Sequence, residues 1–261
     1  MRSSASIAWA VWKALFLREA VARLSAGRAA WVWILVEPVV HLVFLNVLFG
    51  FVLQQVVAGI EGGLFITTGV LGFMIMRNSA TKPKDAVSAN VKLLAYRQVL
   101  PVDTVLVRAA LEAMLFVVSA LILFSGLGLL AYGYKAFPHD PLQVMLGFAT
   151  LWLAGTGLGL IFSVASELFP KAGKMIIDTL FRPLYFISGV MYPASAIPPA
   201  YQSVFLSNPL VHGIETVRAG FFPQYHTIQG VSVGYLLGFA MFTICLGLAL
   251  HVRFSARLVA Q

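Results

Sequence analysis

Few residues in this 261-residue chain have the types and spacing that chemistry requires. Glu37 and His41 lie four positions apart, which would place them on one helix face, where such a pair can bind a metal ion. No HExxH sequence or further cluster of ligands accompanies them, and Cys245 has no second cysteine to pair with. We therefore expect no metal site and no internal disulfide bond. A structural hydrogen bond, or an interfacial position for Glu37, is the favoured interpretation of the pair.

Glycine-rich sequences do not indicate a nucleotide site. Gly155, Gly157 and Gly159 lie inside an apolar stretch and lack the strand–turn–helix context of a dinucleotide site. The Gly-Lys sequence at 173–174 is followed by Met175, where a P-loop has Ser or Thr. The chain also lacks a recognisable set of nucleophile and base. We therefore expect no enzymatic activity and no cofactor in this chain, so that uphill transport would draw on an ion gradient or a separate ATPase.

Asp178 and Arg182 form a second pair at helical spacing, directly before an uncharged stretch. Two interpretations remain open for this pair. It can be an ion pair within one helix, because side chains four residues apart are neighbours on a helix surface. Alternatively, Arg182 can be a cation that attracts an anionic ligand at the end of a membrane span.

The elements that would position these residues are membrane-spanning helices. The chain is 60% hydrophobic and 11% charged, whereas soluble domains have about 25% charged residues. A helix needs roughly 20 apolar residues to cross a bilayer, and Asp, Glu, Lys and Arg are absent from 38–60, 62–76, 113–134, 141–166, 183–214 and 219–252. We predict one all-α integral membrane domain over residues 1–261, with six transmembrane helices at about 30–57, 62–78, 103–131, 141–168, 175–192 and 230–251.

Proline and glycine positions add detail to these helices. The long stretch 183–214 includes four prolines that disfavour one continuous helix, namely Pro193, Pro198, Pro199 and Pro209. We predict that the fifth span is followed by a broken, re-entrant region over 193–222. Close helix packing is predicted at two GxxxG pairs, which are Gly155 with Gly159 and Gly234 with Gly238.

Basic residues indicate the orientation. Lys135 and Arg218 are the only basic residues in the first, third and fifth connections, and the rest lie at the two ends and in the even-numbered connections. The positive-inside rule therefore predicts that both termini are cytoplasmic. The same topology explains the formal net charge of +8 better than nucleic-acid binding, which needs a solvated basic face. Charged residues interrupt the N-terminal region, so we expect no cleaved signal peptide and expect residues 1–29 in the mature chain.

The N-terminal segment 6–26 combines Trp9, Trp12 and Phe16 with basic side chains, a mixture suited to the membrane surface. We predict an interfacial helix. Its charges do not form a clean polar stripe, so it can also pack against neighbouring helices. It can be a topogenic anchor or a functional gate helix.

The region 79–102 is the largest predicted cytoplasmic connection. Pro83 suits the first position of a helix, and Val87, Val91 and Leu94 then fall on one face. A short amphipathic helix of this kind can insert into the groove of a partner protein. A solvated loop helix is the alternative interpretation.

Six motifs give the chain a close resemblance to a known family. They are ALFLRE at 14–19, EPVVHL at 37–42, YRQVLPVDT at 96–104, RAALE at 108–112, RPLYFISG at 182–189 and NPLVH at 208–212. In this order and spacing the chain resembles the ABC-2 type transport permeases, specifically the KpsM-like permeases of bacterial capsular polysaccharide export, almost from end to end. Two departures are Arg182, where the family also has lysine, and Leu94 with Ala95, where an aromatic and a polar residue are common.

The resemblance implies an ATP-driven exporter in the bacterial inner membrane. Two copies of the chain would form its membrane half, and two copies of a P-loop ATPase, which binds ATP and Mg²⁺, would power it. The substrate would be an anionic polysaccharide on a glycolipid anchor, which a periplasmic co-polymerase-type adaptor and an outer-membrane exporter would receive. Export of O-antigen or teichoic acid is an alternative. An ion-gradient-driven secondary transporter is another, although no internal repeat relates 1–130 to 131–261.

The resemblance also implies roles for particular residues. The ATPase would contact a coupling helix near 84–97, through Lys84, Asp85, Val87, Asn90, Val91, Leu93, Leu94, Tyr96 and Arg97. The substrate channel would include Arg182, Tyr185, Phe186, Tyr192 and Tyr201, because aromatic rings stack on sugars and arginine attracts acidic groups. Ordinary helix packing is the alternative for each aromatic ring. The short helices of 193–222 would close the periplasmic exit.

Overall fold

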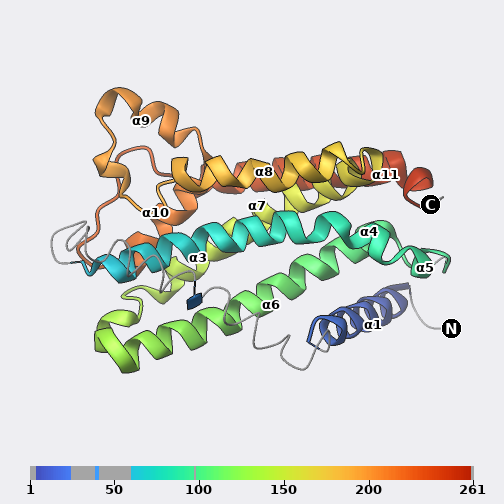
Figure 1. Cartoon of the computed structure of the whole chain (residues 1–261), viewed down its shortest axis with the longest axis horizontal. Coiled ribbons are helices and arrows are strands. Elements are labelled where there is room, and N and C mark those ends of the chain that lie inside the picture. Colours follow the sequence, from blue (N-terminus) through green and yellow to red (C-terminus); the bar gives the residue numbers. More distant parts are fainter. Residues whose placement is uncertain (1–3, 25–38, 41–59, 97, 260–261) are drawn as a thin grey trace.

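The computed structural model describes residues 4–24, 39–40, 60–96 and 98–259. These residues form an elongated bundle of helices (Figure 1). The first predicted span, 30–57, lies outside the described residues except for Val39 and Val40. Glu37 and His41 also lie outside them.

Among the described residues, three helical segments are long and apolar enough to cross a membrane. They are α6 (Pro101–Leu127), with its continuation through η2 (Gly128–Tyr132) and η3 (Gly133–Ala136), then α7 (Pro141–Leu168) and α11 (Val233–Val259). They lie where the third, fourth and sixth spans are predicted. Proline occupies the first turn of α6 and α7, where its missing N–H removes no helical hydrogen bond. Asp140 caps α7 by accepting hydrogen bonds from the amides of Leu142 and Gln143 at 3.0 and 3.1 Å.

Two shorter helices differ strongly in burial. Sixteen of the twenty residues of α3 (Gly62–Thr81) are buried, and its length of about 30 Å matches a bilayer core. In contrast, α8 (Ala172–Ile187) spans roughly 24 Å, and of its sixteen residues only Ile177 and Phe181 are buried. The helix ends before the predicted limit of the fifth span because the chain turns at Gly189, whose φ of 68° favours glycine.

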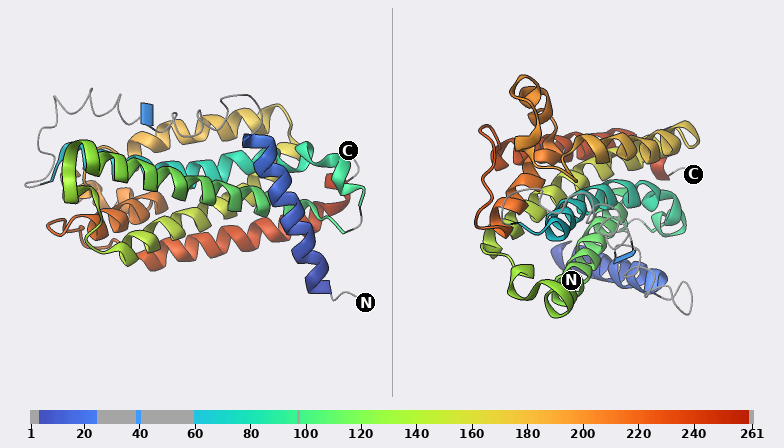
Figure 2. Two further views of the ribbon diagram at one scale, coloured as in Figure 1. Left: turned by 90° about the horizontal axis from the view of Figure 1, so that it is seen from below. Right: turned by 60° about the vertical axis from the view of Figure 1, so that its left-hand side comes forward.

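The two ends of the bundle carry different short elements. One end carries η4 (Ala194–Ala196), α9 (Pro199–Leu206) and α10 (Pro209–Phe221). The opposite end carries α4 (Ala86–Ala89), α5 (Val91–Leu94), the start of α1 (Ser4–Leu24) and the end of α11 (Figures 1 and 2). Prolines begin α9 and α10, so region 193–222 is broken as the sequence predicts. Its depth in a membrane stays a prediction.

Glycines allow α7 to approach two neighbouring helices closely. A Cβ atom at Gly155 would lie 2.5 Å from the Met76 carbonyl oxygen of α3, and Gly159 is similarly crowded by α3. A Cβ atom at Gly157 would lie 2.2 Å from the hydroxyl oxygen of Thr243 in α11. The close contact predicted for the first GxxxG pair is therefore confirmed.

Helix α11 also has an open face. No atom lies within 4 Å of a Cβ atom built at Gly238, so the second predicted GxxxG pair makes no such contact within the described residues. Several large apolar side chains on this helix are exposed, including Met241 and Phe242. The single cysteine, Cys245, is exposed on the same helix.

A buried arginine fastens α10 to the turn after α8. Arg218 is fully buried and donates hydrogen bonds to the carbonyl oxygens of Gly189 at 2.8 Å and Val190 at 2.7 Å. Its guanidinium also lies 3.2 Å from the Glu215 carboxylate and 3.7 Å from the centre of the Phe65 ring. A buried charge is costly unless it is paired and hydrogen-bonded. These contacts therefore hold α3, α10 and the turn in one arrangement.

The substitution Gly155→Ala should destabilise the bundle, because the added methyl group would overlap the Met76 carbonyl oxygen. We expect a loss of about 1–3 kcal/mol, measured as a lower thermal midpoint of the purified protein. Gly126→Ala is the matched control, because no atom lies within 4 Å of the added Cβ atom. At position 126, alanine has a higher helix propensity than glycine, so the substitution should leave stability unchanged or raise it by up to ~1 kcal/mol. Equal midpoints for the two variants would contradict the close α3–α7 contact.

Candidate functional site

The predicted coupling helix is divided into three short segments at one end of the molecule (Figure 1). They are η1 (Lys82–Asp85), α4 and α5, and α3 runs directly into the first. The break falls at Asn90, whose side-chain amide donates to the Ala86 carbonyl oxygen at 2.8 Å. Because asparagine side chains compete for backbone hydrogen bonds, one continuous helix over 84–97 does not form.

The apolar face of this region points into the protein. Val87 is fully buried and Leu94 is 4% exposed, and both belong to a core cluster with Val105 and Leu160. Val91 is half-buried. This placement corrects the predicted docking face, because Val87 and Leu94 already fill the chain's own core and cannot present their side chains to a partner.

A different set of side chains is exposed in the same region. Tyr96 is 67% exposed, and Ala89 and Lys92 are exposed near it. The other predicted contacts are less accessible or not described: Lys84 and Asn90 are buried, Asp85 and Leu93 are half-buried, and Arg97 lies outside the described residues. The surface that a partner can reach therefore includes Ala89, Lys92 and Tyr96.

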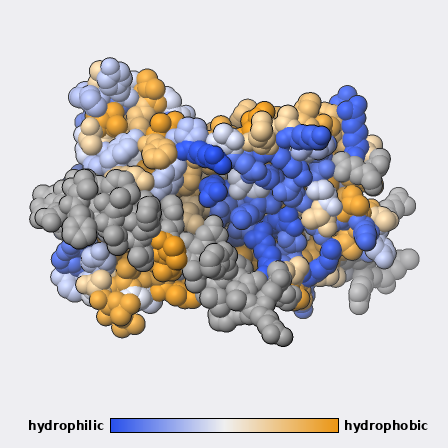
Figure 3. Space-filling model, in the orientation of Figure 1, coloured by the Kyte–Doolittle hydropathy of each residue, from blue (hydrophilic) through white to orange (hydrophobic). Residues whose placement is uncertain are grey.

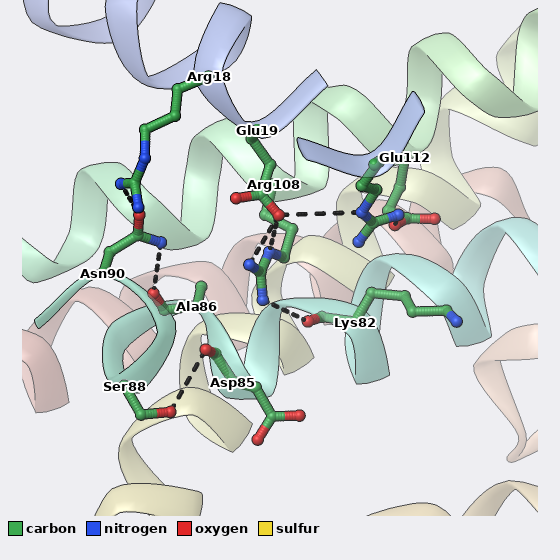
Figure 4. Close-up of polar contacts among 10 residues, drawn as sticks. Arg18, Glu19, Lys82, Asp85, Ala86, Ser88, Asn90, Arg108 and Glu112 are labelled. Carbon is green, nitrogen blue, oxygen red and sulfur yellow. Dashed lines mark hydrogen bonds and ion pairs between the residues drawn. The ribbon is translucent and has the colours of Figure 1, made fainter. Parts of the chain in front are cut away.

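Polar contacts hold α1 against this region (Figure 4). Arg18 donates to the side-chain oxygen of Asn90 at 2.6 Å, and Arg108 of α6 lies 2.6 Å from Glu19. Two further contacts join α1 to α6: Trp12 with Asp103, and Arg23 with Glu112. The prediction that the N-terminal segment can pack against neighbouring helices is confirmed. Its position at a membrane surface stays a prediction.

Two ion pairs connect η1 to the first turns of α8. Lys84 pairs with Asp178, and Asp85 pairs with Lys174 at 2.6 Å. The partner of Asp178 is therefore a residue of another element, and the predicted helix-internal pair with Arg182 is wrong. Among the described residues, no ion pair involves Arg182.

Three predicted channel residues lie together in one pocket. Arg182, Tyr185 and Phe186 of α8 line a cavity of about 600 Å³, together with Phe73 and Arg77 of α3. The Tyr185 ring is in edge contact with Phe73, at 4.9 Å between ring centroids, and with Phe186 at 5.5 Å. Sequence reasoning missed Arg77. Its position directly after the second uncharged stretch, at the same predicted membrane side as Arg182, is the signal that could have found it.

The other two predicted channel residues lie elsewhere. The hydroxyl of Tyr192 donates to the Phe186 carbonyl oxygen at 2.8 Å, in the turn after α8. Tyr201 is 66% exposed on α9, at the end of the bundle opposite to α4 and α5 (Figure 1). The structure therefore brings together three of the five residues.

Positive charge predominates around the pocket. Arg77 and Arg182 are exposed and form no ion pair among the described residues, whereas Asp178, the acidic residue of the lining, is paired with Lys84. Figure 3 shows the face of the molecule that is seen in Figure 1. Hydrophilic side chains gather on the half of that face that is nearer to α4 and α5. Within the described part of the chain, no group of three or more His, Cys, Asp or Glu residues could hold a metal ion. The pocket thus suits an anionic, organic ligand.

Comparison with known proteins identifies the family. A family model described as ABC-2 type transporter matches residues 10–222. The chain belongs to the ABC-2 type transporter family. It is 36% identical over 239 residues to the polysialic acid transport protein KpsM of Escherichia coli, which covers 92% of this chain and 91% of that protein. This ABC-2 chain is also 29% identical over 254 residues to the capsule polysaccharide export inner-membrane protein BexB of Haemophilus influenzae, covering 97% and 94%.

A third similar protein is the capsule polysaccharide export inner-membrane protein CtrC of Neisseria meningitidis, with 29% identity over 243 residues, 93% of this chain and 90% of that protein. The family resemblance drawn from six short motifs is thereby confirmed. BexB and CtrC are both named as inner-membrane proteins of capsule polysaccharide export.

Charge reversal of Arg108 should release α1, because Arg108→Glu would face Glu19 with a like charge. A charge-assisted hydrogen bond contributes about 1.5–3 kcal/mol, so we expect backbone amides in α1 to exchange hydrogen at least about ten-fold faster. Mass spectrometry of the purified protein measures this rate. The double variant Arg108→Glu with Glu19→Arg should restore slow exchange. Arg253→Glu, on an exposed residue of α11, is the control. Unchanged exchange in Arg108→Glu would show that this pair does not hold α1.

Proposed function

We propose that this ABC-2 chain is the permease subunit of an ATP-driven exporter that moves lipid-linked, acidic capsular polysaccharide across the bacterial inner membrane. Two copies of the chain assemble with two copies of a P-loop ATPase, which binds ATP and Mg²⁺. A periplasmic co-polymerase-type adaptor and an outer-membrane exporter receive the product. The relatives named for polysialic acid transport and capsule polysaccharide export support this cargo.

The observation that carries the proposal is the pocket between α3 and α8. It combines the cations Arg77 and Arg182 with the rings of Tyr185 and Phe186. Acidic sugars and the phosphate of a lipid anchor are attracted to such cations, and screening is weaker in a partly dehydrated pocket than in bulk water. Aromatic rings offer apolar faces to sugar rings. Aromatic rings and arginine side chains are expected together at the place where a chain of anionic sugars enters a membrane channel.

The exposed surface of Ala89, Lys92 and Tyr96 is the proposed ATPase contact. These residues lie at the end of the bundle that also carries the start of α1 and the end of α11 (Figure 1). With six spans, both termini and this surface are cytoplasmic, and α9 and α10 are re-entrant helices at the periplasmic end. The shared end of the two termini agrees with an even number of crossings.

The substitution Tyr96→Asp should weaken the ATPase contact, because it replaces an exposed aromatic ring by a charge at the docking surface. Truncation of an interface hot spot costs about 2 kcal/mol or more, which corresponds to a roughly 30-fold loss of affinity. Co-purification of the ATPase with the permease measures the effect. Tyr201→Asp is the matched control, because Tyr201 has nearly the same exposure, 66% against 67%, at the other end of the bundle. Full retention of the ATPase by Tyr96→Asp would contradict the assigned surface.

Removal of the charge at Arg182 should impair export. We expect Arg182→Ala to lower surface polysaccharide at least about ten-fold at equal protein level, because a charge-assisted contact contributes ~1.5–3 kcal/mol. Arg182→Lys should retain most export, because a point charge suffices for an anion. Arg253→Ala, an exposed arginine on α11, is the control. Normal export by Arg182→Ala would remove this residue from the substrate path.

A further inference from the structure

The two ion pairs between η1 and α8 have opposite polarity. Lys84 and Asp85 are adjacent and opposite in charge, and their partners Asp178 and Lys174 lie one helical turn apart on α8. Lys84 thus reaches the later position of α8, and Asp85, the next residue of η1, reaches the earlier one. If α8 shifted by one turn along η1, Lys84 would face Lys174, and the two like charges would repel each other. The arrangement therefore favours one relative position.

Hydrogen bonds attach η1 and α4 to α7 beside this junction. The Ser166 hydroxyl donates to the Lys84 carbonyl oxygen at 2.6 Å, and the Ser88 amide donates to the Glu167 carboxylate at 3.1 Å. Both partners belong to the last turn of α7. Lys84 is buried, with its side chain 11% exposed, so its pair with Asp178 is shielded from solvent on one side. Dissolved salt weakens the attraction within a partly buried ion pair less than within a fully exposed one.

The start of α8 also packs closely on α7, where a Cβ atom at Gly173 would lie 2.9 Å from the Ala165 carbonyl oxygen. Among the described residues of α8, only Ile177 and Phe181 are buried, whereas most of α3 is buried and packed on α7. Because so few residues of α8 are buried, the ion pairs with η1 are specific polar contacts that add to this packing. The pocket begins at the same place, because Asp178 and Arg182, one turn apart, both line it.

We propose that the ion pairs Lys84–Asp178 and Asp85–Lys174 transmit movement of the ATPase-docking segment to α8 and so to the substrate pocket. The inference rests on the proposed docking of an ATPase at Ala89, Lys92 and Tyr96. The four charged residues are positioning residues. When α4 and α5 move with the ATPase, η1 draws the first turns of α8 with it, and Arg182 and Tyr185 change position relative to Arg77 of α3.

The test reverses the pair that does not line the pocket. Asp85→Lys opposes Lys174 with a like charge, Lys174→Asp does the same to Asp85, and the double variant restores attraction with the signs exchanged. Each variant replaces the wild-type chain in cells, where surface polysaccharide is measured. Each is also purified with the P-loop ATPase, to measure retention of the ATPase and its rate of ATP hydrolysis. Lys171→Asp, an exposed charge outside both pairs, is the control.

We expect both single reversals to retain the ATPase and its hydrolysis, while export falls about ten-fold. The double variant should regain export to within roughly two-fold of wild type. If a charge-reversed variant protein does not accumulate in cells, Asp85→Asn is tested instead. This substitution removes the attraction to Lys174 without adding repulsion. A role confined to folding would lower ATPase retention and export together, and that result would overturn the inference.

Two other results separate this inference from the proposed function. Single reversals that export normally with bound ATPase would overturn the transmission role and leave the exporter assignment intact. A wild-type chain that retains no P-loop ATPase would overturn the proposed function, and the inference with it.

Discussion

The close approach of α7 to α3 and α11 is the contact on which the rest of the structure depends. Lipid tails are as apolar as leucine side chains, so membrane helices gain little from burying apolar surface and associate through packing of small residues. Gly155 meets the backbone of α3 and Gly157 meets α11, which leaves no room even for a methyl group. This three-helix layer fixes where α3 ends, and therefore where η1 and the docking segment begin. The other helices are arranged around it.

Charged residues connect the outer elements to that layer at its two ends. At one end, Arg218 joins α10 to the turn after α8 through backbone carbonyl groups. At the other end, ion pairs join α1 to α6 and η1 to α8. The first set is fully buried and includes main-chain acceptors, which favours a rigid junction. The second set is partly exposed and relies on side chains, which allows rearrangement. The chain thus combines a rigid end with an adjustable one.

Sequence patterns predicted the parts of this arrangement that depend on local properties. The third, fourth and sixth spans follow from length and hydropathy, and the family follows from the order of short motifs. The inward direction of Val87 and Leu94 could not be predicted, because periodicity defines a helix face but not what the face meets. Likewise, Asp178 has an apparent partner four residues away, yet it pairs with Lys84, 94 residues distant in sequence. Arg77 was missed because its neighbour across the pocket belongs to another helix.

The single exposed cysteine of α11 gives the protein a built-in labelling position. Cys245 is the one thiol in the chain, so a small membrane-permeant nitroxide reagent would attach at one defined place per subunit without any substitution. A water-soluble maleimide would react slowly there, because a thiol within an apolar span stays protonated. Cys245 lies on the helix that packs against Gly157, close to the rigid layer rather than to the adjustable end. In an assembly of two copies, two identical probes would report one distance. That distance would describe the spacing of the two bundles directly, with the native sequence as its own reference.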